Sequence, residues 1–253
     1  MLSPCVVKIG GNELDRPEWI AECARRLGRV SPLVVVHGGG QGITAVSRRL
    51  GLPVEKKDGV RVTTPEIAAV VEMVLAGPIN RQVVDALRAA GLDAIGLTGI
   101  DGGLFSARRT DADLGHVGTI LSVRAGLLEG LLRAGLVPVI APIAPVPGGG
   151  TPFNVNADEA AAAVGAALSA REVLFVSDVP GVAVGGTTQR ELAISELETL
   201  ISTGVARDGM AAKLRAAAAA LRGGARGVRI GNLDMLDGPA AGTRIVDAAT
   251  EPA

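Results

Sequence analysis

The chain has 253 residues, with 25 Lys and Arg against 26 Asp and Glu, so its formal net charge is −1. This even balance excludes the large positive surface that binding to nucleic acid or to an anionic membrane requires. Aromatic residues make up only 2% of the chain and tyrosine is absent, which argues against a stacking surface for single-stranded nucleic acid. The length predicts one large domain or two tightly joined lobes.

The sequence shows no sign of export or membrane insertion. It contains no run of 18 apolar residues, and its first residues lack the basic and apolar regions of a signal peptide. Cys5 and Cys23 form neither a CxxC pair nor a disulfide framework, which is typical of a reducing compartment. With only His37 and His116 beside them, a zinc site is not expected, and we predict no metal site built from protein side chains. We expect a cytoplasmic protein that binds no membrane.

Short aliphatic runs alternate with longer amphipathic stretches along the whole chain. The predicted strands are nearly continuous in Val, Leu and Ile, as buried parallel strands are: Cys5–Ile9, Leu33–Val36, Ala94–Leu97, Val137–Ile140, Val173–Val176 and Gly227–Ile230. The predicted helices are Pro17–Leu27, Gly42–Leu50, Pro65–Ala90, Arg124–Ala134, Ala157–Ser169, Ile194–Ser202 and Gly209–Arg222. This alternation predicts an α/β fold with a mostly parallel sheet flanked by helices. Its active site is expected beyond the carboxyl ends of the strands.

Two segments depart from this alternation. Leu52–Thr64 carries an Asp58-Gly59 step between β-prone runs, which predicts a hairpin, and we interpret it as a mobile flap beside the substrate. Pro142–Pro152 is too rich in Pro and Gly to be the interior of an element. We expect this loop to separate two lobes, at about residues 1–146 and 147–253.

Two glycine-rich turns follow predicted strands. Lys8 is followed by Ile9-Gly10-Gly11, where an ammonium group and backbone amides can converge on an anion. His37 is followed by Gly38–Gly40 at the entrance to a helix, where exposed amides and the helix dipole favour phosphate or carboxylate. Neither turn matches the P-loop, and no GxGxxG occurs. His37 itself is interpreted as structural, because no Ser, Cys or Asp partner stands nearby in sequence.

Two further groups of polar residues stand at predicted helix starts. Asn154, Asn156 and Asp158 precede an Ala-rich helix, and capping that helix needs only one of them. Lys213 lies on the first turns of another Ala-rich helix, where a positive charge is electrostatically unfavourable. A nearby phosphate would compensate for that charge.

These motifs, in this order, resemble the amino-acid kinase family, and within it the branch that phosphorylates N-acetyl-L-glutamate. The residues that carry the resemblance are KIGG at 8–11, VHGGG at 36–40, GVRVT at 59–63, LGHVG at 114–118, NVNAD at 154–158, SDVPG at 177–181, DGM with a following Lys at 208–213, and GTRIV at 242–246. The resemblance implies a single three-layer αβα sandwich with an N-terminal amino-acid lobe and a C-terminal ATP lobe.

The resemblance also implies a reaction, in which the γ-phosphoryl group of ATP, bound with Mg²⁺, passes to the side-chain carboxylate of N-acetyl-L-glutamate during arginine biosynthesis. The implied catalytic residues are Lys8, Lys213 and Asp158. The implied substrate-binding residues are Gly39, Gly40, Arg61, Asn154 and Asn156. The implied nucleotide-binding residues are Gly10, Gly11, Ser177, Asp178, Gly181, Val182, Gly209 and Met210. Mg²⁺ is expected to be held mainly by phosphates and water.

Three other functions stay open. A kinase of carrier-protein-linked aminoadipate or glutamate shares the stretch GLTGIDGGLF at 96–105, whereas GVRVT at 59–63 favours the free acetylated amino acid. A non-catalytic amino-acid-binding regulator is disfavoured because Lys8, Lys213 and Asp158 are all retained. A nicotinamide-dependent oxidoreductase is the weakest of the three.

The resemblance bears on assembly as well. Arginine-inhibited members of the family carry an additional N-terminal helix that links dimers into a hexamer, and here the first predicted strand begins at about Cys5. We therefore expect a homodimer with weak or no inhibition by arginine. The long helical stretch Pro65–Ala90 is the expected dimer contact.

Overall fold

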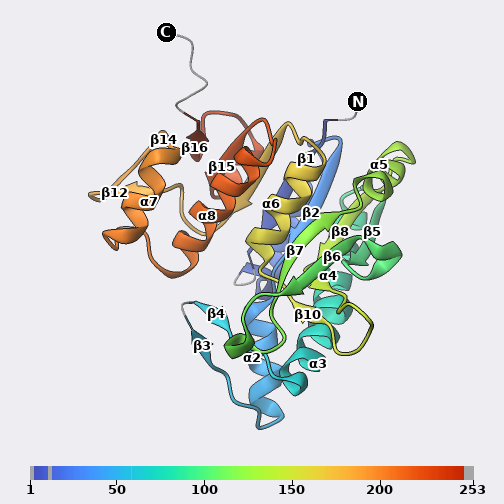
Figure 1. The fold of residues 1–253 in the computed structure, drawn as a ribbon. Helices are drawn as coiled ribbons and strands as arrows, with labels where there is room; N and C mark the ends of the chain where they lie inside the picture. The colour runs from blue at the N-terminus through green and yellow to red at the C-terminus, as the bar shows by residue number, and fades with distance from the viewer. Residues whose placement is uncertain (1–2, 11–12, 58, 248–253) are drawn as a thin grey trace.

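A computed structural model describes residues 3–10, 13–57 and 59–247. Its centre is an eight-stranded sheet in the order β14-β16-β15-β11-β1-β2-β8-β5, shown in Figure 1. The strands are β1 (Cys5–Ile9), β2 (Leu33–His37), β5 (Ala94–Thr98), β8 (Val137–Ala141), β11 (Glu172–Val176), β14 (Glu191–Ala193), β15 (Val228–Gly231) and β16 (Thr243–Val246). Within this sheet only β15 and β16 pair antiparallel. The predicted mostly parallel α/β sheet is confirmed.

The sheet is buried on both faces, which is why its strands are aliphatic throughout. In β1, Val6 packs into one core cluster, whereas Val7 and Ile9 pack into the other. In β2, Val34 and Val36 likewise lie on the first side. Successive side chains of a strand point to opposite faces, so each strand contributes to both cores.

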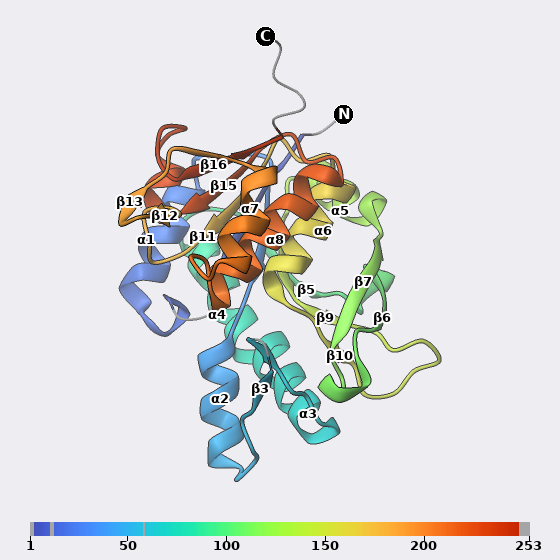
Figure 2. The same ribbon diagram turned by 60° about the vertical axis from the view of Figure 1, so that its left-hand side comes forward.

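Helices cover the two faces and complete the predicted three-layer αβα sandwich. One face carries α5 (Ala125–Arg133), α6 (Ala157–Ala167) and α8 (Asp208–Arg222), and the other carries α1 (Pro17–Leu27) and α4 (Asn80–Ala89). Helices α6 and α8 pack closely on each other because the facing side chains are largely Ala. At one end of the sheet, α2 (Gly40–Arg49) and α3 (Pro65–Val74) extend outward beside the hairpin of β3 (Lys56–Lys57) and β4 (Val60–Arg61), as Figure 2 shows.

Several elements that were not predicted from the sequence lie outside the core of the central sheet. The hairpin of β6 (Phe105–Arg109) and β7 (Gly118–Val123) packs beside α6, and the small hairpin of β12 (Ala183–Val184) and β13 (Thr187–Thr188) precedes β14 and α7 (Ile194–Ser202). Short helical turns are η1 (Glu13–Asp15), η3 (Asp101–Gly103), η4 (Ala112–Leu114) and η5 (Leu233–Leu236). In β6 and β7 exposed and polar residues interrupt the aliphatic pattern, and β12 and β13 have two residues each, so none of them shows the aliphatic run that identifies the central strands.

The predicted helix Pro65–Ala90 is interrupted. Between α3 and α4 lies a wide π-helical turn, η2 (Leu75–Ile79), where Gly77 has φ −91° and ψ −110° and Pro78 cannot donate a backbone hydrogen bond. Among the described residues, Pro65–Ala89 is the one helical stretch long and apolar enough to cross a membrane. More than half of it is buried, so it serves as a core helix.

The two irregular segments fold as follows. The predicted hairpin within Leu52–Thr64 is confirmed, since Lys56 pairs with Arg61 across the turn; Asp58 of that turn lies outside the described residues. The predicted loop Pro142–Pro152 contains a short strand near its start, since β9 (Ile143–Ala144) pairs with β10 (Phe153–Asn154), which follows the loop. The division into two lobes at about residue 146 stays a prediction.

Candidate active site

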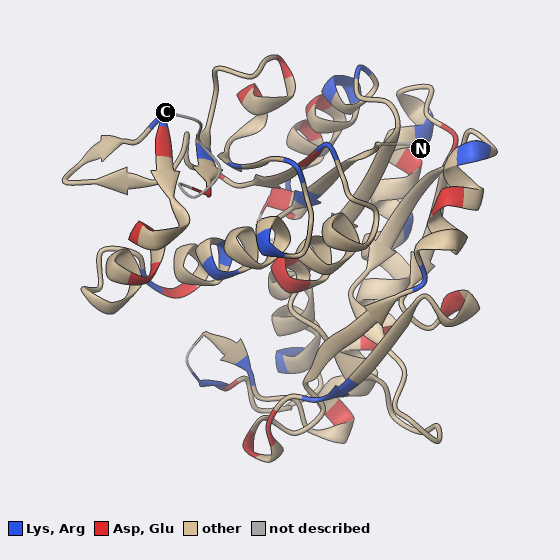
Figure 3. Cartoon of the chain, turned by 45° about the horizontal axis from the view of Figure 1, so that its top comes forward, with Lys and Arg blue, Asp and Glu red and all other residues tan. Residues whose placement is uncertain are grey.

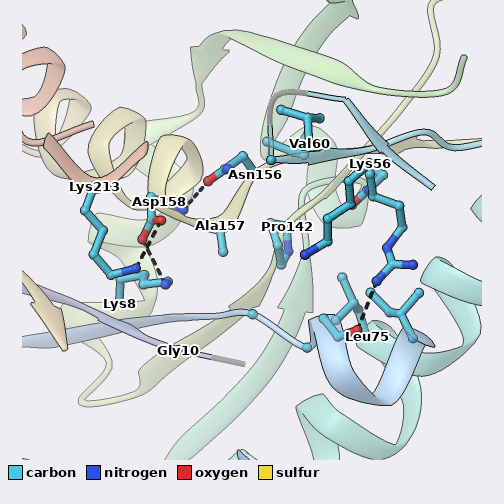
Figure 4. A pocket seen from close by; sticks show the side chains of 18 of the residues that line it. Lys8, Gly10, Lys56, Val60, Leu75, Pro142, Asn156, Ala157, Asp158 and Lys213 are labelled. Carbon is cyan, nitrogen blue, oxygen red and sulfur yellow. Dashed lines mark hydrogen bonds and ion pairs between the residues drawn. The ribbon is translucent and has the colours of Figure 1, made fainter. Parts of the chain in front are cut away.

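Two lysines and one aspartate form a buried ionic centre at the carboxyl end of β1. The ammonium nitrogen of Lys8 lies 2.8 Å from Oδ1 of Asp158, and that of Lys213 lies 3.6 Å from Oδ2. The exposed fraction of these side chains is only 7–12%. Lys8 comes from β1, Asp158 from the first turn of α6 and Lys213 from the second turn of α8, and Figure 4 shows them converging. Three distant segments thus deliver one carboxylate and two ammonium groups to one point.

The charges of this centre favour an anion. Burial opposes ionisation of Asp158, but the ammonium groups of Lys8 and Lys213 outweigh it and hold the pKa of the carboxyl group below its usual value. Burial lowers the pKa of Lys213, the ammonium group of Lys8 lowers it further, and Asp158 opposes both. One carboxylate between two ammonium groups leaves a net positive charge, so a phosphate oxygen brought to the two lysines is stabilised.

The glycine turn after β2 provides backbone amides next to this centre. Gly39 precedes α2, and a Cβ placed on Gly39 would lie only 2.4 Å from Cδ2 of Leu75 and 2.6 Å from Cδ1 of Ile79. A larger residue therefore does not fit at position 39 unless the side chains of Leu75 and Ile79 move. The first amides of α2 have no intrahelical acceptor and point along the helix dipole, which makes this turn an anion site.

Arg61, on β4, is anchored against the same turn. Its Nη2 donates hydrogen bonds to the carbonyl oxygen of Gly40 at 3.0 Å and to Oγ1 of Thr44 at 2.7 Å. Burial lowers the pKa of Arg61, and its buried Nη1 has no hydrogen-bond partner among the described residues. A guanidinium group with one anchored and one unpaired nitrogen suits a carboxylate ligand.

The two asparagines of the NVNAD motif have different partners. Nδ2 of Asn154 donates to Oγ1 of Thr63 at 3.2 Å, and that hydroxyl donates to the carbonyl oxygen of Arg61 at 2.9 Å. Asn154 is therefore linked to the hairpin that carries Arg61. Asn156 is the N-cap of α6, and its Oδ1 accepts hydrogen bonds from the backbone amides of Asp158 and Glu159.

These groups line one cavity of about 310 Å³, on the side of the sheet where the parallel strands end. Among the predicted site residues, the cavity is lined by Lys8, Gly10, Gly39, Gly40, Arg61, Asn154, Asn156, Asp158, Ser177, Asp178 and Lys213. Four basic side chains line it against three acidic ones, whereas charges of both signs are spread over the rest of the molecule (Figure 3).

The other predicted nucleotide-binding residues lie outside this cavity. Gly181 packs against Thr243, whose hydroxyl accepts the hydrogen bond from the backbone amide of Val182 at 2.8 Å. Gly209 lines a neighbouring cavity of about 470 Å³ between α6 and α8, and Met210 packs against the core. Gly11 lies outside the described residues.

The sequence did not identify two further charged residues of the cavity. Lys56 faces the cavity from β3, directly across the hairpin from Arg61 (Figure 4). The predicted two-residue turn was a usable signal, because it places these residues opposite each other on one face. Glu13, in η1, is 6% exposed and its Oε2 has no hydrogen-bond partner among the described residues. No local pattern marks it as part of the site.

Comparison with known proteins agrees with this geometry. The family model described as "Amino acid kinase family" matches residues 3–232, and the chain belongs to that family. An acetylglutamate kinase of Chloroflexus aggregans is 45% identical over 95% of this chain and 96% of the relative. An acetylglutamate kinase of Geobacillus kaustophilus is 43% identical over 85% of this chain and 84% of the relative. The crystal structure of smu.665 from Streptococcus mutans UA159 covers 96% of this chain and 98% of that chain, with a TM-score of 0.83 and 28% identity.

Proposed function

We propose that the protein is an enzyme that transfers the γ-phosphoryl group of ATP to the side-chain carboxylate of N-acetyl-L-glutamate, the acetylglutamate kinase reaction of arginine biosynthesis. The observation that carries the proposal is the single cavity in which Lys8, Asp158 and Lys213 meet the glycine turn and Arg61. The similarity to relatives named acetylglutamate kinase over nearly the whole chain supports the same substrate.

The chemistry matches the side chains of the cavity. A γ-carboxyl group has an ordinary pKa of about 4.3, so the nucleophile is already ionised at neutral pH and needs no general base. The enzyme must instead bring two anions together and stabilise the charge of the transferring group during in-line displacement. A cavity with buried ammonium groups and backbone amides fulfils that requirement.

Each residue then has a task set by its position. Lys8 and Lys213 contact the transferring phosphoryl group, and Asp158, held between them at 2.8 and 3.6 Å, keeps both ammonium groups in place. The amides of Gly39 and Gly40 hold the reacting oxygens at the start of α2. Arg61 and Asn154, linked through Thr63, bind the α-carboxylate of the substrate.

The nucleotide would occupy the C-terminal part of the site. Ser177 and Asp178 line the cavity, and Gly209 lines the adjoining one, which shares Asn156 and Asp158 with the first. Within residues 3–10, 13–57 and 59–247 no three His, Cys, Asp or Glu side chains are grouped to hold a metal ion. Both carboxylate oxygens of Asp158 face lysines. In the proposed reaction Mg²⁺ would be held mainly by the phosphates of ATP and by water, and it would neutralise phosphate charge.

The direct test is the loss of phosphoryl transfer in Lys8→Ala and Lys213→Ala, measured as ADP release with N-acetyl-L-glutamate. Each variant is expected to lose at least about 100-fold in kcat, as removal of one preorganised charge stabiliser does. Lys57→Ala is the matched control, because Lys57 is half exposed and pairs with Asp113 outside the cavity. If Lys8→Ala and Lys213→Ala keep the kcat of the control, the assignment is wrong.

We also propose that two copies of the chain associate through the α3–α4 stretch. Met73 of α3 is an exposed large apolar side chain, at 53% exposure. Sedimentation equilibrium is expected to give a dimer and Met73→Lys a shift toward monomer. A hexamer, or a dimer that Met73→Lys leaves unchanged, would contradict this arrangement.

A further inference from the structure

Beneath the glycine turn lies a fully buried pair of polar side chains, His37 at the end of β2 and Asn80 at the start of α4. They are 0% and 1% exposed. Nε2 of His37 lies 3.0 Å from Nδ2 of Asn80, and Nδ1 of His37 lies 3.0 Å from the carbonyl oxygen of Gly38. Neither side chain lines the cavity, so contact with the substrate does not explain them.

The neighbours of Asn80 determine which atoms carry protons. The carbonyl oxygen of Val139 can only accept a hydrogen bond, so it faces Nδ2 of Asn80, at 3.0 Å; the guanidinium group of Arg81 can only donate, so it faces Oδ1, at 2.5 Å. Nδ2 therefore also donates to Nε2 of His37. An Nε2 that accepts requires the proton of a neutral imidazole on Nδ1, which then donates to the carbonyl oxygen of Gly38.

The hydrogen bond between His37 and the carbonyl oxygen of Gly38 also fixes the backbone amide that follows it. The carbonyl of Gly38 and the N–H of Gly39 belong to the same planar trans peptide unit and point in opposite directions. Holding the oxygen toward the ring of His37 therefore sets the direction of the Gly39 amide. A turn of consecutive glycines has little conformational preference of its own, so such an external constraint is needed.

Asn80 is itself firmly held. It contacts Val139 on β8, and it directly follows the wide turn η2, whose Leu75 and Ile79 pack against Gly39. The same helix junction thus positions the glycine turn through apolar contact on one side and through the imidazole of His37 on the other. The interruption between α3 and α4 allows both contacts to be made at once.

We propose that His37 and Asn80 are positioning residues that orient the Gly39 amide toward the reacting oxygens; this rests on the function proposed above. Their substitution should lower kcat per folded molecule with little change in the KM of either substrate. A merely structural pair would instead affect activity only through the amount of folded enzyme.

Two substitutions at position 37 separate the contacts. In His37→Asn the side-chain amide nitrogen takes the place of Nδ1 and still donates to the carbonyl oxygen of Gly38. In His37→Gln the longer side chain places its amide at the position of Nε2, where it contacts Asn80. The carbonyl oxygen of Gly38 then has no donor from position 37. We expect His37→Gln to lose about tenfold in kcat, the value of one hydrogen bond, and His37→Asn to stay within about threefold of the wild type. Asn80→Leu removes the donor to Nε2 without adding a carboxylate and should lower kcat in the same direction as His37→Gln, and the double variant should lose little more than His37→Gln alone.

Val83→Ala is the control, since it removes a buried side chain of α4 without touching either hydrogen bond. It should lower the urea midpoint yet keep the kcat of the wild type. Nitrogen NMR should find His37 protonated on Nδ1, and hydrogen exchange of the Gly39 amide should be faster in His37→Gln than in His37→Asn.

Equal kcat for His37→Asn and His37→Gln, a proton on Nε2, or unchanged exchange at Gly39 would overturn the proposal. If the wild type fails to phosphorylate N-acetyl-L-glutamate, the proposed function fails instead. The tautomer and the exchange rate still decide whether His37 orients the amide.

Discussion

Removal of the charge of Asp158 should both destabilise the protein and stop phosphoryl transfer. In Asp158→Asn the ammonium groups of Lys8 and Lys213 remain buried without a counter-charge. At an effective dielectric constant near 20, the attractions lost across 2.8 and 3.6 Å are about 6 and 5 kcal/mol. Relief from burying the carboxylate offsets part of this loss, so the net cost is expected at about 3–5 kcal/mol, as for other broken buried ion pairs.

The cost can be measured by urea unfolding followed by circular dichroism. ADP with sulfate should recover part of the lost stability, because anions replace the missing carboxylate as partner of the two lysines. The kcat should fall by about 10²–10³, since the phosphoryl-contacting groups lose their fixed positions. Asp234→Asn is the control: Asp234 is an exposed partner of Arg26, and its loss should change the unfolding free energy by less than about 1 kcal/mol. Wild-type stability and kcat in Asp158→Asn would refute the reasoning.

Three further predictions address other parts of the site. Arg61→Lys should raise the KM of N-acetyl-L-glutamate about 10–100-fold and leave that of ATP unchanged, because a hydrogen bond to a charged group contributes about 1.5–3 kcal/mol; unchanged KM values would contradict the role of Arg61. Gly39→Ala should lower the unfolding free energy by about 1–3 kcal/mol, because the added Cβ would overlap the side chains of Leu75 and Ile79. Gly40→Ala should leave the unfolding free energy unchanged, because a Cβ on Gly40 meets nothing within 4 Å. Equal urea midpoints for the two variants would argue against the close approach at Gly39. Burial lowers the pKa of His37 from 6.5 to about 4. As the pH falls, the unfolded chain therefore binds a proton on this side chain before the folded protein does. The contribution of the neutral imidazole to the unfolding free energy is complete above pH 6.5 and is lost as the pH falls toward 4. Between pH 7 and pH 5 the wild type should lose about 2 kcal/mol more than His37→Gln in urea unfolding, and parallel pH profiles would contradict a buried neutral imidazole.

The central sheet could be predicted because strands buried on both faces are nearly continuous in Val, Leu and Ile. The strand Cys5–Ile9 and the helices Pro17–Leu27 and Ile194–Ser202 have the predicted bounds. The strand β16 (Thr243–Val246), which lies between β14 and β15, and the hairpin of β6 and β7 were missed, because their pairing depends on tertiary neighbours and not on a local aliphatic run. The same holds for the wide turn between α3 and α4, where Gly77 and Pro78 interrupt an otherwise helical pattern.

The site was predictable where its residues follow parallel strands. Lys8 and the glycine turn end neighbouring strands, so their convergence follows from topology. That Lys8 and Asp158 belong to one catalytic site was expected only through the family resemblance, and the contact of His37 with Asn80 was not expected at all. Asn80 stands 43 positions away from His37, on a helix of the layer that packs against the sheet. No local sequence pattern records such a contact, because it arises only when the sheet and helix pack together.

The most direct test of the account is the choice of phosphoryl acceptor. ADP release should be measured with ATP and Mg²⁺ across N-acetyl-L-glutamate, free glutamate, aspartate, N-acetylaminoadipate and a carrier-linked aminoadipate, with the acyl phosphate trapped by hydroxylamine. We expect rapid turnover of free N-acetyl-L-glutamate, one trapped acyl group per ADP, and much slower turnover of the others. Absence of turnover with N-acetyl-L-glutamate, or faster turnover of the carrier-linked acid, would contradict the proposed function.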